Sequence, residues 1–367
     1  MINDKKVVAF ICECNPFHAG HKCLINAARK EGDILIAIMS GNFVQRGEPA
    51  VYNKYQRTNI LIKNGVDLVI ELPIECSLAS ANIFASSSIY IINKLGFVDK
   101  VIFGSNINDI RKLSKYAEVD IYSESNTKIR ELLKEGYSYP KIISNIYGKN
   151  LSPNDILAVE YIRAINKLKS KIIPICIKRS SDLPTASELR KKIAKRIDLD
   201  SFSDILNYKI LSAKNDLINY AYIQGMTLDM YNSLINSSGK NLSFEKRSKL
   251  LNAKNRTLSN IKRTLLCLVF DIKKTNSIKS NYIRILGLKK SFLPYLKNIK
   301  IPYLLSYAPS SYRSFLKNFP TSKAIKQNKN GEFILSPSIK QNIFATNFYN
   351  FISNNKMLES TTKTIIL

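Results

Sequence analysis

The chain has 367 residues, enough for two or three domains, and 45% of them are hydrophobic, as in a globular protein. Its 56 lysines and arginines face 28 acidic residues, and the resulting net charge of +28 favours a polyanionic partner. The sequence shows neither a signal-like start nor an apolar stretch of about 18 residues, which argues against secretion and membrane spanning and predicts a cytoplasmic protein.

The positive charge is concentrated in the second half of the chain. Residues 1–200 hold 30 lysines and arginines against 21 acidic residues, whereas residues 201–367 hold 26 against 7. We therefore expect a polyanion to contact mainly the second half. A coding bias toward Lys, Asn and Ile is an alternative explanation that the sequence leaves open. The six cysteines show no paired metal-ligand spacing, which predicts reduced thiols and no protein-bound metal.

The first segment that carries candidate functional residues lies at residues 7–32. Residues 7–12 form a β-branched apolar run, typical of a buried strand in a parallel sheet, and Asn15-Pro16 interrupts it. From Gly20 to Glu31 apolar residues recur at helical spacing, and Gly32 follows. The pattern predicts a strand, a tight turn and a helix.

Both histidines of the chain, His18 and His21, flank Gly20 at the start of this helix. A helix N-terminus after a buried strand attracts phosphate, and glycine allows a ligand to approach the backbone closely. Two imidazoles can donate hydrogen bonds to phosphate oxygens whose charge grows during attack at an α-phosphorus. We therefore predict a nucleotide phosphate site. The alternative is that both histidines make only structural hydrogen bonds.

Further strands are predicted at residues 34–39, 67–73, 101–103 and 172–177, with helical patterns between them. This alternation through residue 195 indicates an α/β fold with a Rossmann-like, doubly wound parallel sheet. The turn at residues 40–43 and Gly104 follow strand ends, so we expect them in the same crevice as His18. The segment contains no G-x-G-x-x-G fingerprint and no P-loop.

The helices between these strands carry further candidate residues. Lys54 and Arg57 belong to a helical pattern at residues 55–64, where each is either a phosphate ligand or part of a solvated face. Asn154 and Asp155 follow a helix-start signal at Ser152, and capping is the simpler interpretation of both. A helix after residue 184 opens with a possible second phosphate clamp made of Thr185, Ser187 and Arg190.

From residue 201 onward the pattern is mainly helical, with few strand signals. We therefore predict a catalytic domain at residues 1–200 and a mainly helical, basic region at residues 201–367. The segment 252–268 predicts an amphipathic helix whose basic face suits a phosphodiester backbone. Its candidate RNA-binding residues are Lys254, Arg256, Lys262 and Arg263. The last thirty residues are rich in Asn and Ser, which favours a loosely held end.

The turn N-P-F-H-A-G-H at residues 15–21 resembles the H-x-G-H signature of the nucleotidyltransferase superfamily. Further motifs follow in order: M-S-G-N-F-V-Q-R-G-E-P-A (39–50), G-V-D-L-V-I-E-L-P (65–73), F-G-S (103–105), S-P-N-D-I-L (152–157), K-R (178–179) and Y-I-R-I-L-G (282–287). Together they are similar to the bacterial tRNA(Met) cytidine acetate ligase family over nearly the whole chain. The family usually reads S-A-T-x-I-R where this chain has T-A-S-E-L-R at 185–190, and the preceding loop is shortened.

The resemblance implies a two-step reaction. Acetate and ATP give acetyladenylate and pyrophosphate, and the acetyl group then passes to N4 of the wobble cytidine of elongator tRNA(Met). His18 and His21 would bind phosphates and stabilise the adenylation transition state, and Mg²⁺ is expected to accompany ATP. The implied ATP-binding residues are Ile11, Cys12, Glu13, Cys14, Asn15, Pro16, Phe17, His18, Ala19, Gly20, His21, Lys22, Cys23, Leu24, Gly104, Asn154 and Arg179.

Two other functions fit part of the sequence. A small-molecule adenylyltransferase of cofactor synthesis would use the histidine turn but leave the basic second half without a role. An RNA-binding protein with a degenerate nucleotide fold would need neither histidine. The residues indicate neither the preferred acid nor the oligomeric state.

Overall fold

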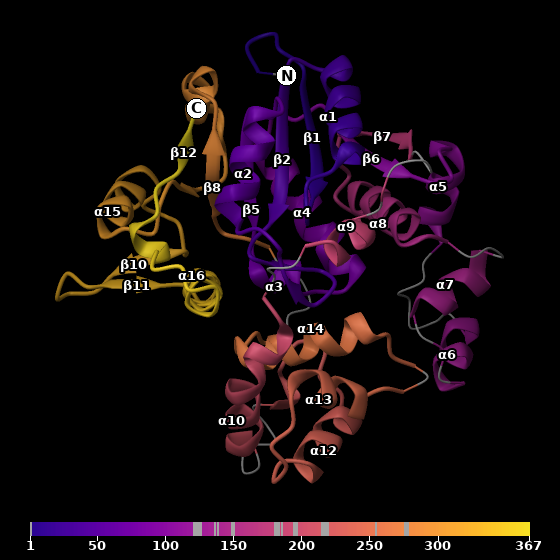
Figure 1. The fold of residues 1–367 in the computed structure, drawn as a ribbon. Coiled ribbons are helices and arrows are strands. Elements are labelled where there is room, and N and C mark those ends of the chain that lie inside the picture. The colour runs from indigo at the N-terminus through magenta and orange to yellow at the C-terminus, as the bar shows by residue number, and fades with distance from the viewer. Residues whose placement is uncertain are drawn as a thin grey trace.

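The structure, a computed structural model, describes residues 2–119, 127–135, 137, 139–147, 151–179, 184, 186–193, 197–213, 220–253, 255–274 and 279–367. Its centre is an eight-stranded sheet (Figure 1). Every pair of neighbouring strands is parallel except β5 with β8. The strand order is β12 (Ile365–Ile366), β8 (Ile283–Leu288), β5 (Leu68–Leu72), β2 (Ile34–Ser40), β1 (Val7–Cys12), β6 (Lys100–Ser105) and β7 (Ile173–Lys178), and β9 (Tyr303–Leu304) pairs with β8.

Helices cover both faces of the sheet, as the doubly wound prediction requires. Alternate residues of β1 serve the two cores, because side chains of a strand point to opposite faces. Val8 and Phe10 pack with α1 (Ala19–Glu31) and α2 (Lys54–Lys63). Val7 and Ala9 pack in the core of the other face, which is covered by α4 (Ala81–Leu95), α5 (Ile110–Glu118) and α8 (Pro153–Lys167).

The five predicted strands of the first half, β1, β2, β5, β6 and β7, are all present, and the α/β prediction is confirmed. A small hairpin and four helices complete the first 191 residues among those described. They are β3 (Phe43–Val44), β4 (Glu48–Pro49), α3 (Ile74–Ser77), α6 (Thr127–Lys134), α7 (Tyr139–Tyr147) and α9 (Ala186–Lys191).

A helical region follows the sheet and has its own apolar core, built from residues such as Leu206, Met230, Phe244 and Leu265. Figure 1 shows it below the carboxyl ends of β1 and β2. Its helices are α10 (Ser203–Ala213), α12 (Leu228–Asn236), α13 (Phe244–Leu250) and α14 (Leu258–Val269), and a 3-10 helix (Leu199–Phe202) precedes them. The predicted helix at 252–268 corresponds to α14, which begins six residues later.

The last third of the chain returns to the sheet, which the sequence pattern did not indicate. Strands β8, β9 and β12 extend it beyond β5, so the sheet crosses the predicted boundary at residue 200. The other elements are 3-10 helices at Lys290–Asn298 and Glu359–Thr361, α15 (Pro309–Asn318), β10 (Ile325–Gln327), β11 (Phe333–Leu335) and α16 (Pro337–Ile352). Nowhere in the described ranges is a helix both long and apolar enough to cross a bilayer.

The expectation of a loosely held C-terminus is wrong. Glu359 is completely buried and forms an ion pair with Lys54 of α2 at 2.8 Å. Lys54 Nζ also contacts Glu71 Oε1 of β5 at 2.8 Å. The polar composition of the last thirty residues was misleading because Glu359 belongs to a buried ion network with Lys54 and Glu71. This network fixes the end of the chain against the sheet.

Candidate active site

The two histidines cap α1 reciprocally. His18 is the N-cap residue, and its Nδ1 accepts a hydrogen bond from the Gly20 backbone N–H at 3.0 Å. His21 Nδ1 accepts from the backbone N–H of His18 at 3.3 Å. The two rings lie 4.0 Å apart between centroids. Both imidazoles therefore satisfy amide groups that a helix N-terminus otherwise leaves unpaired.

This capping fixes the tautomers. A neutral imidazole that accepts at Nδ1 carries its proton at Nε2. His18, which is neutral, can therefore hold the helix start with Nδ1 and still present an Nε2–H donor, whereas the side chain of the more deeply buried His21 also bonds Cys14. The structural bonds that the sequence left as an alternative are present, and they are compatible with phosphate binding, which stays a prediction.

The two imidazoles differ in their electrostatic surroundings. Burial, together with the nearby His21 and Arg179, lowers the pKa of His18 to about 4. Burial also disfavours the charged form of His21, but the buried Cys14 beside it outweighs burial and raises the pKa of His21 above the ordinary value. Near neutral pH, His18 is consequently a neutral donor.

A proton NMR titration tests this difference directly, because the chain contains only two histidines. We expect the His18 Hε1 resonance to titrate near pH 4 and that of His21 above the ordinary 6.5. The folded-state pKa of His18 lies below its unfolded value. At a pH between these two pKa values the unfolded chain therefore binds more protons than the folded chain, so the free energy of unfolding falls as the pH decreases from the unfolded to the folded pKa. Titration of both resonances near 6.5 would contradict the assignment.

Gly20 has a structural role that the sequence did not indicate, and close approach of a ligand to its backbone stays a prediction. A Cβ atom at this position would lie 2.8 Å from His18 Cε1 and 3.0 Å from His18 Nδ1. The glycine therefore leaves room for the His18 ring in its capping position.

The buried Arg57 side chain stabilises the histidine turn. Arg57 is completely buried and donates to the backbone carbonyls of Glu13 at 2.6 Å, Ser40 at 3.0 Å, Tyr52 at 2.9 Å and Gly41. It ties the carboxyl ends of β1 and β2 together. Both interpretations of Lys54 and Arg57 drawn from the sequence are wrong, because neither residue is solvated or directed at a ligand: each is engaged by protein groups.

The ends of β6 and β7 meet beside the turn. The Arg179 stem runs across Gly104, where an added Cβ would lie 3.1 Å from Arg179 Cγ. Asp155 Oδ1 accepts from Ser105 Oγ at 2.6 Å and from the backbone N–H of Asn106 at 2.8 Å, which fixes the N-terminus of α8, and with it Asn154, against β6. Burial opposes ionisation of Asp155, but these hydrogen bonds prevail and lower its pKa. The local sequence pattern indicates only a capping role for Asp155.

Within the implied ATP-binding stretch, the side chains differ in burial and in their contacts. Ile11, Cys12, Cys14 and Leu24 pack in the cores on either side of the sheet. Asn15 is buried, and its Oδ1 accepts from the Val51 backbone N–H at 2.8 Å. Phe17 stacks on His21 at 5.7 Å between ring centroids. Pro16 is buried, Glu13 is intermediate, and Ala19, Lys22 and Cys23 are exposed.

The proposed second clamp lies close to the turn but is engaged with protein atoms. Arg190 Nη1 donates to the Asn15 carbonyl at 2.7 Å, and Nη2 donates to Ser187 Oγ at 3.0 Å. Arg190 Nε lies 3.5 Å from Glu48 Oε1. Thr185 lies outside the described residues. Arg190 thus positions the turn, and phosphate binding by this group stays a prediction.

Two of the four candidate RNA-binding residues of the second half, Arg256 and Arg263, are engaged by protein groups. Lys254 lies outside the described residues. Arg256 pairs with Asp229 at 3.4 Å. Lys262 is half-buried, whereas Arg263 Nη1 donates to the Gln45 carbonyl at 2.8 Å. RNA contact by these residues stays a prediction.

Gln45, in the hairpin of β3 and β4, connects α14 to the histidine turn. The Gln45 backbone N–H donates to Glu13 Oε1 at 2.6 Å, while its carbonyl accepts from Arg263. Gly47, at φ +75°, lies against the backbone of α14, where a Cβ would be 2.6 Å from the Arg263 nitrogen. Burial raises the pKa of Glu13. No local pattern indicates this connection, because it depends on a contact between residues 218 positions apart.

Three comparisons agree with this geometry. A family model described as HIGH nucleotidyl transferase matches residues 5–195 and 183–363. The tRNA(Met) cytidine acetate ligase of Fervidobacterium nodosum is 32% identical, with 96% of each chain covered, and that of Fusobacterium nucleatum is 34% identical, covering 81% of this chain and 86% of the relative. The crystal structure of Thermotoga maritima TmcAL bound with alpha-thio ATP superposes with a TM-score of 0.83 at 27% identity, covering 99% of both chains.

The mostly parallel sheet and the histidine-capped helix define a nucleotidyltransferase of the HIGH type. Among such proteins, the full-length similarity is more specific. The chain belongs to the tRNA(Met) cytidine acetate ligase family.

Proposed function

We propose that this chain condenses acetate with ATP to acetyladenylate, with release of pyrophosphate, and then acetylates N4 of the wobble cytidine of elongator tRNA(Met) to form N4-acetylcytidine. The observation that carries the proposal is the reciprocal histidine cap at the N-terminus of α1, which leaves the Nε2–H of His18 to donate. The relatives named as tRNA(Met) cytidine acetate ligases supply the substrates.

In the first step an acetate oxygen bonds to the α-phosphorus, and the bond from that phosphorus to the bridging oxygen of pyrophosphate breaks. Negative charge grows on the phosphate oxygens along this path. Fixed Nε2–H donors and the amide groups of a helix N-terminus stabilise such charge without reorganising. Arg179, whose stem lies against Gly104 and whose charge disfavours protonation of both histidines, adds a cation.

In the second step the cytidine N4 attacks the acetyl carbonyl carbon, AMP leaves, and N4 loses one proton. The acceptor is a polyanion, which agrees with the excess of 19 positive charges carried by residues 201–367. Arg263 and Arg256 contribute to the internal structure of this region, so phosphate contact falls to its exposed lysines.

Mg²⁺ is expected to enter with ATP. In the described part of the chain, no group of three His, Cys, Asp or Glu side chains is placed to hold a metal ion. The residues of the site therefore fit an ion held by the triphosphate, whose oxygens Mg²⁺ prefers, with His18, His21 and Arg179 contacting the remaining phosphate oxygens.

Acetate-dependent exchange of labelled pyrophosphate into ATP tests the first step without RNA. We expect exchange with acetate, ATP and Mg²⁺, and none when the carboxylic acid is omitted. If no carboxylic acid stimulated exchange, the proposal would fail. Exchange that required a phosphorylated small molecule instead would identify an adenylyltransferase of cofactor synthesis.

The substitution Gly20→Ala is expected to slow this exchange by about 10²-fold, because the new methyl group displaces the His18 ring and small misplacements of a catalytic group have effects of this size. Gly239→Ala is the matched control, since a Cβ there meets no atom within 4 Å. Equal exchange rates in both variants would show that the ring position is unimportant.

A further inference from the structure

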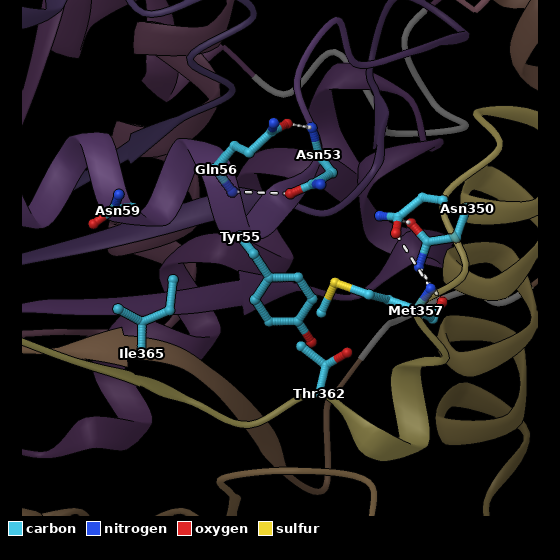
Figure 2. A pocket seen from close by; sticks show the side chains of 9 residues that line it. Asn53, Tyr55, Gln56, Asn59, Asn350, Met357, Thr362 and Ile365 are labelled. Carbon is cyan, nitrogen blue, oxygen red and sulfur yellow. Dashed lines mark hydrogen bonds between the residues drawn. The ribbon is translucent and has the colours of Figure 1, made fainter.

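A pocket of about 530 Å³ lies away from the histidine turn, between α2 and the C-terminal segment. Figure 2 shows its side chains gathered from these two parts of the chain. We call it the amide pocket after its lining, which consists of Asn53, Tyr55, Gln56, Asn59, Asn350, Asn355, Met357, Thr362 and Ile365. Nothing in the adenylation chemistry uses these residues.

The walls of the amide pocket are held by the protein itself. Tyr55 Oη donates to Glu359 Oε2 at 2.8 Å, and Lys54 holds the other oxygen of the same carboxylate at 2.8 Å. Asn350 Nδ2 donates to the Met357 carbonyl at 2.8 Å. The C-terminal segment is therefore anchored to α2 through Glu359 and to α16 through the Asn350–Met357 hydrogen bond, so the pocket is preorganised.

The lining has the chemistry of a site for a neutral planar ring. None of the nine side chains is a carboxylate, an ammonium or a guanidinium, and Tyr55, Met357 and Ile365 supply apolar surface. Asn53 Oδ1 and Gln56 Oε1 accept backbone N–H groups in the cap of α2, at 2.9 and 3.0 Å. Each side chain is left with its amide NH₂ group to donate. Amide donors beside an aromatic ring match the carbonyl and ring-nitrogen acceptors of a nucleobase.

The amide pocket also shares a loop with the active site. The Val51 backbone N–H binds Asn15 of the histidine turn, and Asn53, two residues later, begins the pocket. Lys356, next to Met357, is exposed and available for a phosphate. The loop that carries Val51 and Asn53 therefore joins the pocket directly to the turn.

We propose that the amide pocket binds an unpaired nucleobase of the acceptor RNA while a different nucleotide of the same RNA is modified. This inference rests on the proposed function for the identity of the RNA. Base stacking and edge recognition here would align the target cytidine and distinguish its tRNA from others.

The first test uses the absence of tryptophan from the chain. Met357→Trp places a single indole at the rim of the pocket, at a residue that is 49% exposed. Titration with uridine and cytidine, which carry no phosphate, should quench its fluorescence saturably. In the control variant Asn318→Trp, on exposed α15 surface, quenching should be weak and linear. Identical titrations of the two variants would overturn the proposal.

The second test fills the pocket and measures modification of tRNA(Met). Asn59→Phe should raise the KM for tRNA about 10-fold, the order expected from losing one base contact, with kcat nearly unchanged. Acetate-dependent exchange, which needs no RNA, serves as the control for folding and should stay within about 2-fold of the wild-type rate. An unchanged KM would overturn the proposal. If the wild-type protein showed no acetate-dependent exchange, the proposed function would fail. The nucleoside titration would still test whether the amide pocket binds a nucleobase.

Discussion

Replacing His18 with alanine is expected to slow acetate-dependent ATP–pyrophosphate exchange by about 10²-fold or more. Under the proposed function, the substitution removes an Nε2–H donor that stabilises charge developing in the transition state, and losses of this size follow the removal of one such donor. It also removes the N-cap acceptor for Gly20, which costs about 1 kcal/mol of stability. The exchange rate at saturating ATP and acetate, measured on protein shown to be folded, checks the effect.

A second substitution, His18→Asn, separates the donor role of His18 from its role as the N-cap of α1. Asparagine is a good N-cap residue, so His18→Asn should keep the stability of α1 near that of the wild type. It cannot place a donor where Nε2 lies, and exchange should remain as low as in His18→Ala. Recovery of exchange in His18→Asn would mean that His18 matters only as a cap.

The largest effect on stability is expected for Lys54→Met, at about 3–5 kcal/mol. The substitution leaves the buried carboxylates of Glu71 and Glu359 without their shared cation, and breaking a buried pair from one side has a cost of this order. Urea denaturation checks the value. Lys63→Met, at an exposed position of the same helix, is the matched control and should change stability by less than about 0.5 kcal/mol.

The instability of Lys54→Met should depend on pH with a definite sign. Burial already raises the pKa of Glu71 in the wild type, and loss of Lys54 raises it further. A carboxyl group whose folded-state pKa lies above its unfolded value binds its proton more tightly when folded, so stability falls as the pH rises between the two values. The variant should therefore lose less stability at about pH 5 than at about pH 8. A deficit that grew on acidification would contradict the buried ion network.

The strands of the first half were predictable because each is a continuous apolar run, and burial on both faces of a parallel sheet requires such runs. Strand β8 was missed although residues 283–288 are apolar apart from Arg284. Its surroundings are helical, and its pairing with β5 joins segments more than 200 residues apart. The two-residue strands β9 and β12 have no periodicity to detect. Their formation depends on a sheet edge that only the folded chain provides.

The histidine turn was predictable for a different reason: the chain concentrates both imidazoles at one helix start. The residues that support the turn were not, because a buried arginine and an exposed one have the same sequence signal. Arg57 reaches the carbonyls of Glu13 and Ser40 from α2, and Arg263 reaches the hairpin at Gln45 from α14. Both contacts are long-range, and nothing in their local patterns distinguishes them from solvated cations.

The most direct test of the account is mass spectrometry of tRNA(Met) after incubation with the purified protein, ATP, Mg²⁺ and isotope-labelled acetate. We predict labelled N4-acetylcytidine at the wobble position, formed together with AMP and pyrophosphate and absent when ATP or acetate is omitted. Complete ATP turnover without any acetylated cytidine in the tRNA would contradict it.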